Sequence, residues 1–391
     1  MTAVLGGVGV AGVATAGALL VAEVTGSEST AGLAQTLVVL GGAMLAVPLA
    51  RTSDRRGRRL GLAGGYAIGF VGALAVVAGA SMSSTVVLLA GMALLGGAMA
   101  AGLQSRFAAA DLSSPSRVGR DLSLVVWMTA VGAIVGPSLA DPAAASANAL
   151  GLPALSGVFV WAGVGFAVAA VLLLVGLRPD PLLLSRRGTG ETVRPPPPRL
   201  GLPATLRAIA GVPPARTAFV ALVLAHATMI GLMVMTPLHL DRNGSSLSVV
   251  GVVISVHVAG MYLFAPLVGA LADAIGRERV IGIGAVAIAA SGVIVAGSPS
   301  SSLTVAGALF LLGLGWSCCM VAGSALLTAT LPAEVRPSAQ GVTDLSMGLG
   351  GAVASALAGV VFGVWSYAVL GVAVAVVIAP LTLATVARRR P

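Results

Sequence analysis

Apolar residues fill long, unbroken runs over most of the chain, and Gly, Pro, Ser or charged residues separate one run from the next. Each run has about the 20 residues that a helix needs to cross the hydrocarbon core of a bilayer. The pattern predicts six such helices in the first half, near residues 3–24, 30–50, 60–81, 84–110, 120–140 and 155–177. Six more are predicted near 217–240, 247–271, 280–297, 302–331, 338–362 and 364–387. We therefore expect an all-helical membrane protein with twelve transmembrane helices.

One long polar segment, residues 178–216, interrupts this pattern. It holds several arginines and four consecutive prolines from Pro195 to Pro198. Proline-rich and charged segments of this kind are typical of linkers. We interpret 178–216 as a flexible cytoplasmic linker between an N-terminal half, 1–177, and a C-terminal half, 217–391.

The composition agrees with a membrane protein, because 57% of the 391 residues are hydrophobic and only 9% are charged. A soluble domain cannot cover so much apolar surface. All 22 basic residues are arginines, and they lie between the apolar runs, which excludes a nucleic-acid-binding surface and indicates topology signals instead. With a cytoplasmic N-terminus, only Arg242 falls on the outer side, so both termini are predicted to be cytoplasmic in a bacterial inner membrane.

No catalytic constellation and no cofactor site is recognisable in the sequence. A phosphate-binding loop of the type GxxxxGK[ST] needs a lysine, and the chain contains none. We therefore expect a secondary transporter, driven by a gradient or by exchange, rather than an enzyme or an ATP-driven pump.

The two halves repeat a charged segment after their second helix. Residues 50–59 read ARTSDRRGRR, and residues 269–279 read GALADAIGRER. In both, a small residue is followed by Asp four positions later, then Gly after three more, then Arg. Such a parallel repeat is expected where two six-helix halves enclose a central pathway.

This segment resembles motif A of the major facilitator superfamily, with the pattern G-x-x-x-D-R/K-x-G-R/K-R/K. The first copy departs from it at Ala50, and the second at Ala274 and Glu278. The resemblance implies the major facilitator fold, transport by alternating access, and a gate at the cytoplasmic helix ends. The residues that it assigns to this gate are Asp54, Arg55, Gly57, Arg58, Asp273, Gly276 and Arg277.

Soft metal-binding side chains gather in the predicted seventh and eighth helices, which contain all three histidines of the chain. Steps of three and four residues place His226, Met229 and Met233 on one face of the seventh helix, and His257 and Met261 on one face of the eighth. If the two helices face each other across the turn near Gly244, Met233 lies level with His257 and Met229 with Met261. Thioether and neutral imidazole without carboxylate favour Cu(I) over hard cations.

The spacing MxxxM followed by HxxxM resembles the signature of the CcoA-like copper importers, a group within the same superfamily. The resemblance implies that Met229, Met233, His257 and Met261 bind copper, with His226 as a neighbouring substrate-binding group. It also implies import of a copper ion or a small copper chelate by a protein that needs the lipid bilayer, no nucleic acid and no cofactor. We expect a monomer.

Two alternatives stay open at this point. Met at helical spacing is frequently only core packing, and we assign that role to the adjacent Cys318 and Cys319 in the tenth helix. The other alternative is a proton-coupled antiporter that exports drugs or small lipophilic metabolites, because residues 132–137, GAIVGP, resemble motif C of antiporters. In either kind of transporter, Glu23 or Asp344 is a candidate for carrying the coupling proton.

Overall fold

The computed structural model describes residues 1–111, 118–188, 201–297, 300–332 and 335–387, and every regular element in these ranges is helical. The chain forms two compact units, one of residues 1–194 with 244–255, the other of residues 195–243 with 256–391. Within the described residues, ten helices are long and apolar enough to cross a membrane, and eleven are if the bent pair Thr2–Val13 and Ala16–Thr25 forms one span. The remaining predicted span, 120–140, corresponds to α5.

Six of the helices described in the first unit follow the predicted runs to within a few residues, except at the end of the second run. The helices of this unit are α1 (Thr2–Thr25), α2 (Leu33–Arg56), α3 (Arg58–Ser81), α4 (Thr85–Ala110), α5 (Val118–Ser138), α6 (Ala140–Ala149), α7 (Gly157–Gly176) and α8 (Pro181–Gly188), with short 3₁₀ turns at Glu28–Thr30 and Ala154–Ser156. The short helices α6 and α8 correspond to no predicted run. The run predicted to end at residue 50 continues as helix to Arg56, and because α3 begins at Arg58, every residue of the first charged repeat except Gly57 is helical.

The second unit holds α9 (Leu202–Gly211), α10 (Pro213–Arg242), the later part of α11 (Leu247–Tyr262), α12 (Ala265–Ile275), α13 (Arg277–Gly297), α14 (Ser302–Thr330), α15 (Arg336–Val364) and α16 (Tyr367–Ala387). The segment 178–216, interpreted as the linker, contains α8, α9 and the start of α10. The predicted run 247–271 lies in one apolar stretch, Leu247–Ile275, that is long enough to cross a membrane. The helix is interrupted within it, between α11 and α12, where Pro266 has no N–H to donate to the carbonyl of Tyr262.

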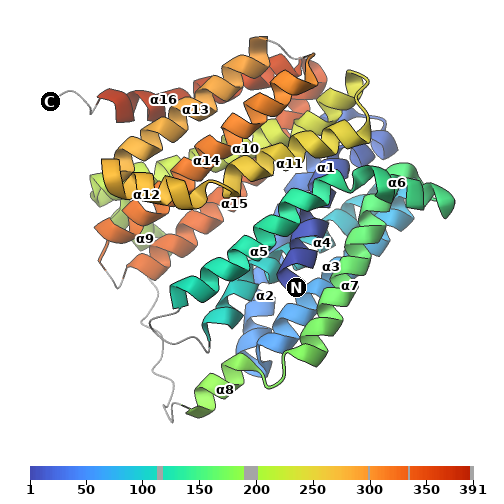
Figure 1. Cartoon of the computed structure of the whole chain (residues 1–391), viewed down its shortest axis with the longest axis horizontal. Coiled ribbons are helices and arrows are strands. Elements are labelled where there is room, and N and C mark those ends of the chain that lie inside the picture. The colour runs from blue at the N-terminus through green and yellow to red at the C-terminus, as the bar shows by residue number, and fades with distance from the viewer. Residues whose placement is uncertain (112–117, 189–200, 298–299, 333–334, 388–391) are drawn as a thin grey trace. The chain divides into compact units, whose positions relative to one another are not determined.

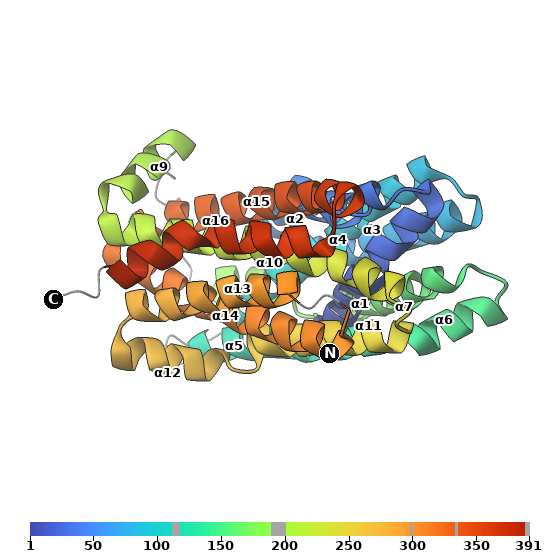
Figure 2. The ribbon, with the colours of Figure 1, turned by 90° about the horizontal axis from the view of Figure 1, so that it is seen from above.

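The helices inside the first unit pack in the same pattern as the helices inside the second unit. In the first, α1 packs against α5 and α7, and α3 packs between α4 and α7. In the second, α10 packs against α15 and α16, and α13 packs between α14 and α16, as Figures 1 and 2 show. The corresponding helices occur in the same order along the chain, so the repeat inferred from the charged segments extends to the packing of both units.

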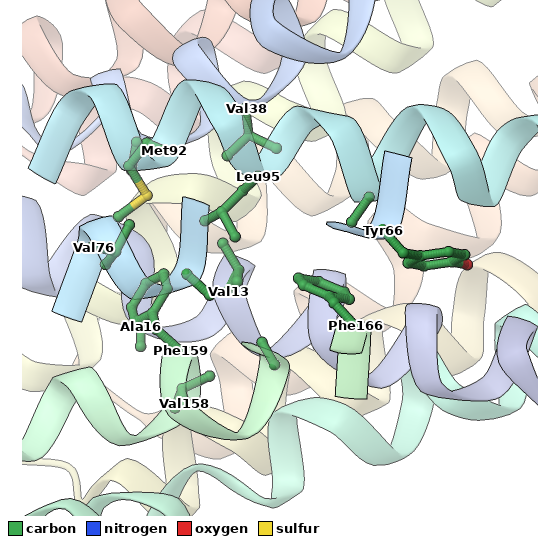
Figure 3. Packing of buried hydrophobic residues seen from close by; sticks show 14 of the residues in the cluster. Val13, Ala16, Val38, Tyr66, Val76, Met92, Leu95, Val158, Phe159 and Phe166 are labelled. Carbon is green, nitrogen blue, oxygen red and sulfur yellow. The ribbon is translucent and has the colours of Figure 1, made fainter. Parts of the chain in front are cut away.

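Small residues and a few large ones form the core of the first unit (Figure 3). The Phe166 ring of α7 and the Tyr66 ring of α3 lie 6.1 Å apart, and both side chains are buried. Figure 3 shows the hydroxyl of Tyr66 pointing away from the apolar cluster. Close packing through small residues is the usual way in which transmembrane helices associate, because lipid gives no hydrophobic drive between them.

Candidate metal site and gate turns

α10 carries three of the candidate residues, His226, Met229 and Met233. Every residue from Thr228 to Leu240 is buried, and Met229 and Met233 are 2% and 7% exposed. The helix packs against α14, α15 and α16. Both methionine side chains are therefore held inside the protein, where bulk water would not compete with their sulfurs for a soft cation.

His257 on α11 is fully buried and held in one orientation. Its Nδ1 lies 2.7 Å from the carbonyl oxygen of Leu309 on α14. A carbonyl only accepts, so Nδ1 carries the proton and, in the neutral ring, Nε2 keeps its lone pair. Among the described residues, this Nε2 atom has no hydrogen-bond partner. A buried acceptor left unpaired costs roughly 1–3 kcal/mol, so its presence needs an explanation.

α11 and α14 approach each other to backbone contact at the HxxxM sequence. A Cβ atom added to Gly313 would lie 3.0 Å from the backbone nitrogen of Met261 and 3.2 Å from Nδ1 of His257. A Cβ added to Gly260 would lie 3.2 Å from the nitrogen of Leu314. Met261 itself is 8% exposed. Glycine on both helices therefore allows α14 to reach the ring of His257 with a main-chain carbonyl.

His226 also forms a hydrogen bond with α14, but here the ring nitrogen Nδ1 accepts the hydrogen bond, whereas Nδ1 of His257 donates one. Nε1–H of Trp316 donates to Nδ1 of His226 over 3.3 Å, and the two ring centroids are 6.3 Å apart. The same indole packs edge-on against Tyr262 of α11, with centroids 5.8 Å apart. Trp316 thus contacts α10 at His226 and α11 one residue after Met261, which places these two stretches at a similar level along α14.

The third histidine and the two cysteines have other contacts. His239 stacks on Tyr367, with centroids 4.2 Å apart and an interplanar angle of 18°, and the Tyr367 hydroxyl lies 2.7 Å from that of Thr236. Cys319 is buried against α13, where its thiol lies 3.7 Å from the carbonyl oxygen of Ile281. Among the described residues, no group of three His, Cys, Asp or Glu could hold a metal ion.

Both repeats of the charged segment make the same turn. Gly57 and Gly276 each have φ of +96°, a conformation that L side chains rarely adopt. The side chain of Asp54 lies outside the described residues, while Arg55 and Asp273 are exposed. Nη1 of Arg277 donates to the carbonyl of Ala325 over 3.2 Å. The backbone of the turn is thus duplicated.

The first turn also has two acidic partners that the sequence pattern did not reveal. Arg58 donates to Asp111 through Nε and Nη2, at 2.8 and 3.3 Å, and the two side chains are 15% and 12% exposed. Asp180, at the start of α8, accepts the backbone N–H of Arg59 over 2.8 Å. Both carboxylates lie beyond their helices' apolar runs, where a motif search has no reason to pair them with residues 50–59.

The candidates for proton coupling and for motif C lie on α1, α15 and α5. Glu23 and Asp344, proposed for coupling, are both exposed, on α1 and α15. Gly132 and Gly136 of the motif C resemblance are buried and pack against the backbone of α1; a Cβ on Gly132 would lie 2.9 Å from the nitrogen of Val8. These glycines therefore have a packing role in the first unit.

Comparison with known proteins agrees with the fold. The profile of the Major Facilitator Superfamily matches residues 1–245 and 218–391. The uncharacterized MFS-type transporter YddS of Bacillus subtilis is 36% identical over 376 residues, which cover 95% of this chain and 86% of the relative. The riboflavin transporter RfnT of Brucella anthropi is 28% identical over 341 residues, or 85% of this chain and 79% of RfnT.

Solved structures agree at the level of the fold alone. The nucleoside transporter NupG covers this chain completely, with a TM-score of 0.76 and 13% identity, and 98% of NupG is matched. A bacterial homologue of the lysosomal transporter Spinster, in an inward-facing conformation, has a TM-score of 0.71 and 16% identity, with 99% of this chain and 92% of the homologue covered.

Proposed function

We propose that this chain, which belongs to the Major Facilitator Superfamily, carries copper ions across the membrane, with Met229, Met233, His257 and Met261 as the ligands. The direction that we propose is import into the bacterial cytoplasm, with both termini on the cytoplasmic side. Transport would follow the alternating access of this superfamily, and the copper ion is the substrate rather than a resident cofactor.

One observation carries the proposal: the unpaired Nε2 of His257. The 2.7 Å hydrogen bond to Leu309 fixes the ring and leaves the lone pair of Nε2 in a fully buried position. Orienting one imidazole nitrogen through a carbonyl at the other is the usual arrangement of histidines that bind metals. Met261 follows one helical turn later, and Met229 and Met233 are buried on α10. A soft monovalent cation suits these neutral donors.

The same donor set suits a transporter that must release its cargo. Three thioethers and one imidazole are uncharged, so neither the empty nor the loaded site has to bury a carboxylate in the membrane. Thioethers bind Cu(I) but are weak enough to exchange it with another soft ligand. Nε2 of the oriented His257 ring would bind the copper ion from a fixed direction, and the methionine sulfurs would complete the coordination shell.

Uptake of radioactive copper by cells that express the protein tests the proposal. Copper accumulation should fall about ten-fold or more in the double variant Met233→Ala/His257→Ala, since two ligands are removed. The matched control is Met235→Leu, because Met235 is also fully buried on α10 but lies about 160° around the helix from Met233, on the opposite face. Unchanged uptake in the double variant, at normal membrane levels, would contradict the proposal.

A second candidate substrate is a flat organic molecule such as riboflavin, which is favoured by the similarity to RfnT. Export of lipophilic compounds, the antiporter alternative, has only the glycines of α5 in its favour, and these pack against α1. Riboflavin uptake by the same cells separates the candidates. Accumulation of riboflavin that survives Met233→Ala/His257→Ala, without copper uptake in the parent protein, would favour the organic substrate.

A further inference from the structure

The helix α14 holds two histidines in opposite tautomers. Its Leu309 carbonyl accepts from Nδ1 of His257, and its Trp316 indole donates to Nδ1 of His226. We infer that Trp316 determines metal specificity: by occupying Nδ1 of His226 it keeps this second imidazole out of the coordination shell. This inference rests on the proposed copper site, and it concerns which residues are excluded from that site.

The hydrogen-bonding chemistry of the indole determines which nitrogen of His226 carries the proton. An indole N–H donates and has no acceptor, so Nδ1 of His226 must be the unprotonated nitrogen. A neutral imidazole carries one proton, which in His226 is then on Nε2. Both nitrogens of His226 are thereby unable to bind a metal, one through its hydrogen bond and the other through its proton. His257 has the reverse arrangement and offers Nε2.

His226 would otherwise be well placed to bind. It lies on α10 one turn before Met229, and it shares the Trp316 ring with Tyr262, the residue after Met261. Its Nε2 lies against α15, only 3.3 Å from where a Cβ of Gly351 would be. If the indole N–H were absent, the proton could move to Nδ1, and Nε2 could then act as a ligand.

The number of imidazoles decides which metal the site prefers. One imidazole with three thioethers is a soft set that favours Cu(I), whereas a second imidazole makes the set more suitable for Zn(II) and Cu(II). Zinc sites rarely use methionine, so the exclusion of His226 would discriminate against zinc. His239, the remaining histidine, is stacked on Tyr367.

The test is Trp316→Phe, which removes the N–H donor and keeps an aromatic ring against Tyr262. The matched control is Trp161→Phe in the first unit, where the lost indole bond goes to Ser146 over 2.9 Å. X-ray absorption of the purified, Cu(I)-loaded protein should show one nitrogen ligand in the wild type and two in Trp316→Phe. The zinc concentration that halves copper uptake should fall about tenfold in this variant. Trp161→Phe should match the wild type.

A change that acts through His226 must vanish when His226 is removed. Trp316→Phe/His226→Ala should therefore return to one nitrogen ligand and to the zinc sensitivity of the wild type. A shell and zinc sensitivity that stay unchanged in Trp316→Phe, or a change that persists in the double variant, would overturn the inference while leaving the copper site intact. A wild type that binds no Cu(I) would overturn both.

A direct measurement does not depend on any variant folding. The ¹⁵N chemical shifts of the imidazole nitrogens in the wild-type protein report which nitrogen carries the proton. The structure requires a bare Nδ1 in His226 and a protonated Nδ1 in His257. A protonated Nδ1 in His226 would overturn the inference.

Discussion

Replacing Gly313 by alanine tests how closely the position of α14 controls His257. The new Cβ would lie 3.0 Å from the backbone nitrogen of Met261 and 3.2 Å from Nδ1 of His257, and it would overlap the carbonyl oxygen of His257. Contacts to a backbone cannot be relieved by rotating a side chain. The two helices must therefore separate at the level of the HxxxM sequence.

The expected cost follows from these contacts. Overpacking of this kind costs about 1–3 kcal/mol, and weakening the hydrogen bond between His257 and Leu309 costs about 1 kcal/mol more. Alanine gains up to about 1 kcal/mol over glycine in helix propensity. The net destabilisation should be about 1–3 kcal/mol. Because the bond that orients a metal ligand is disturbed, Cu(I) affinity should fall about 10- to 100-fold.

Gly307→Ala is the matched control on the same helix, because nothing lies within 4 Å of a Cβ at that position. It should leave Cu(I) affinity unchanged and stabilise the protein slightly. Thermal unfolding and competition for Cu(I) with a chromophoric chelator, both on purified protein, measure the two effects. If Gly313→Ala bound Cu(I) as tightly as the wild type, the orienting role of α14 would be refuted.

Two further predictions concern the first gate turn. Gly57→Ala should lower the melting temperature more than Gly276→Ala, because both have φ of +96° but only at Gly57 does the new Cβ meet a side chain, the Asp180 carboxylate, with Cγ at 2.6 Å; equal effects on the purified protein would argue against a role for Asp180. Asp111→Asn should cost about 1–3 kcal/mol, since it leaves a largely buried guanidinium without its charged partner. Arg58→Gln in the same protein should recover part of that loss, and strictly additive unfolding energies would show that the pair is not coupled.

The spans and the internal repeat could be predicted from the sequence because both depend on short-range patterns. Apolar runs of about 20 residues can satisfy their backbone in a bilayer only as helices, and the spacing of Asp, Gly and Arg carried over to identical turns at Gly57 and Gly276. The break after Tyr262 was missed, because Pro266 is only one residue in a hydropathy average. Such an average does not record that proline lacks the N–H a helix needs at this position. The helices α8 and α9 were missed because proline and arginine dominate the composition around them.

The partners of the candidate site could not be predicted, because they come from a helix with no polar periodicity. Leu309 acts through its carbonyl, Gly313 through the absence of a side chain, and Trp316 through one N–H among apolar neighbours. A pattern search weighs side-chain chemistry and spacing, and none of these three residues stands out in that respect. The spacing of Met and His identified candidate donors, but which nitrogen of each ring is bare depends on tertiary contacts.

The break between α11 and α12 also has an electrostatic consequence. α11 ends at Tyr262, one residue after Met261, and the end of a helix carries a partial negative charge of about half an electron from its free carbonyls. The missing N–H of Pro266 leaves the carbonyl of Tyr262 without its usual helical donor. A cation bound at Met261 would therefore lie close to fixed negative dipoles. Because these dipoles belong to the backbone, they do not change with pH.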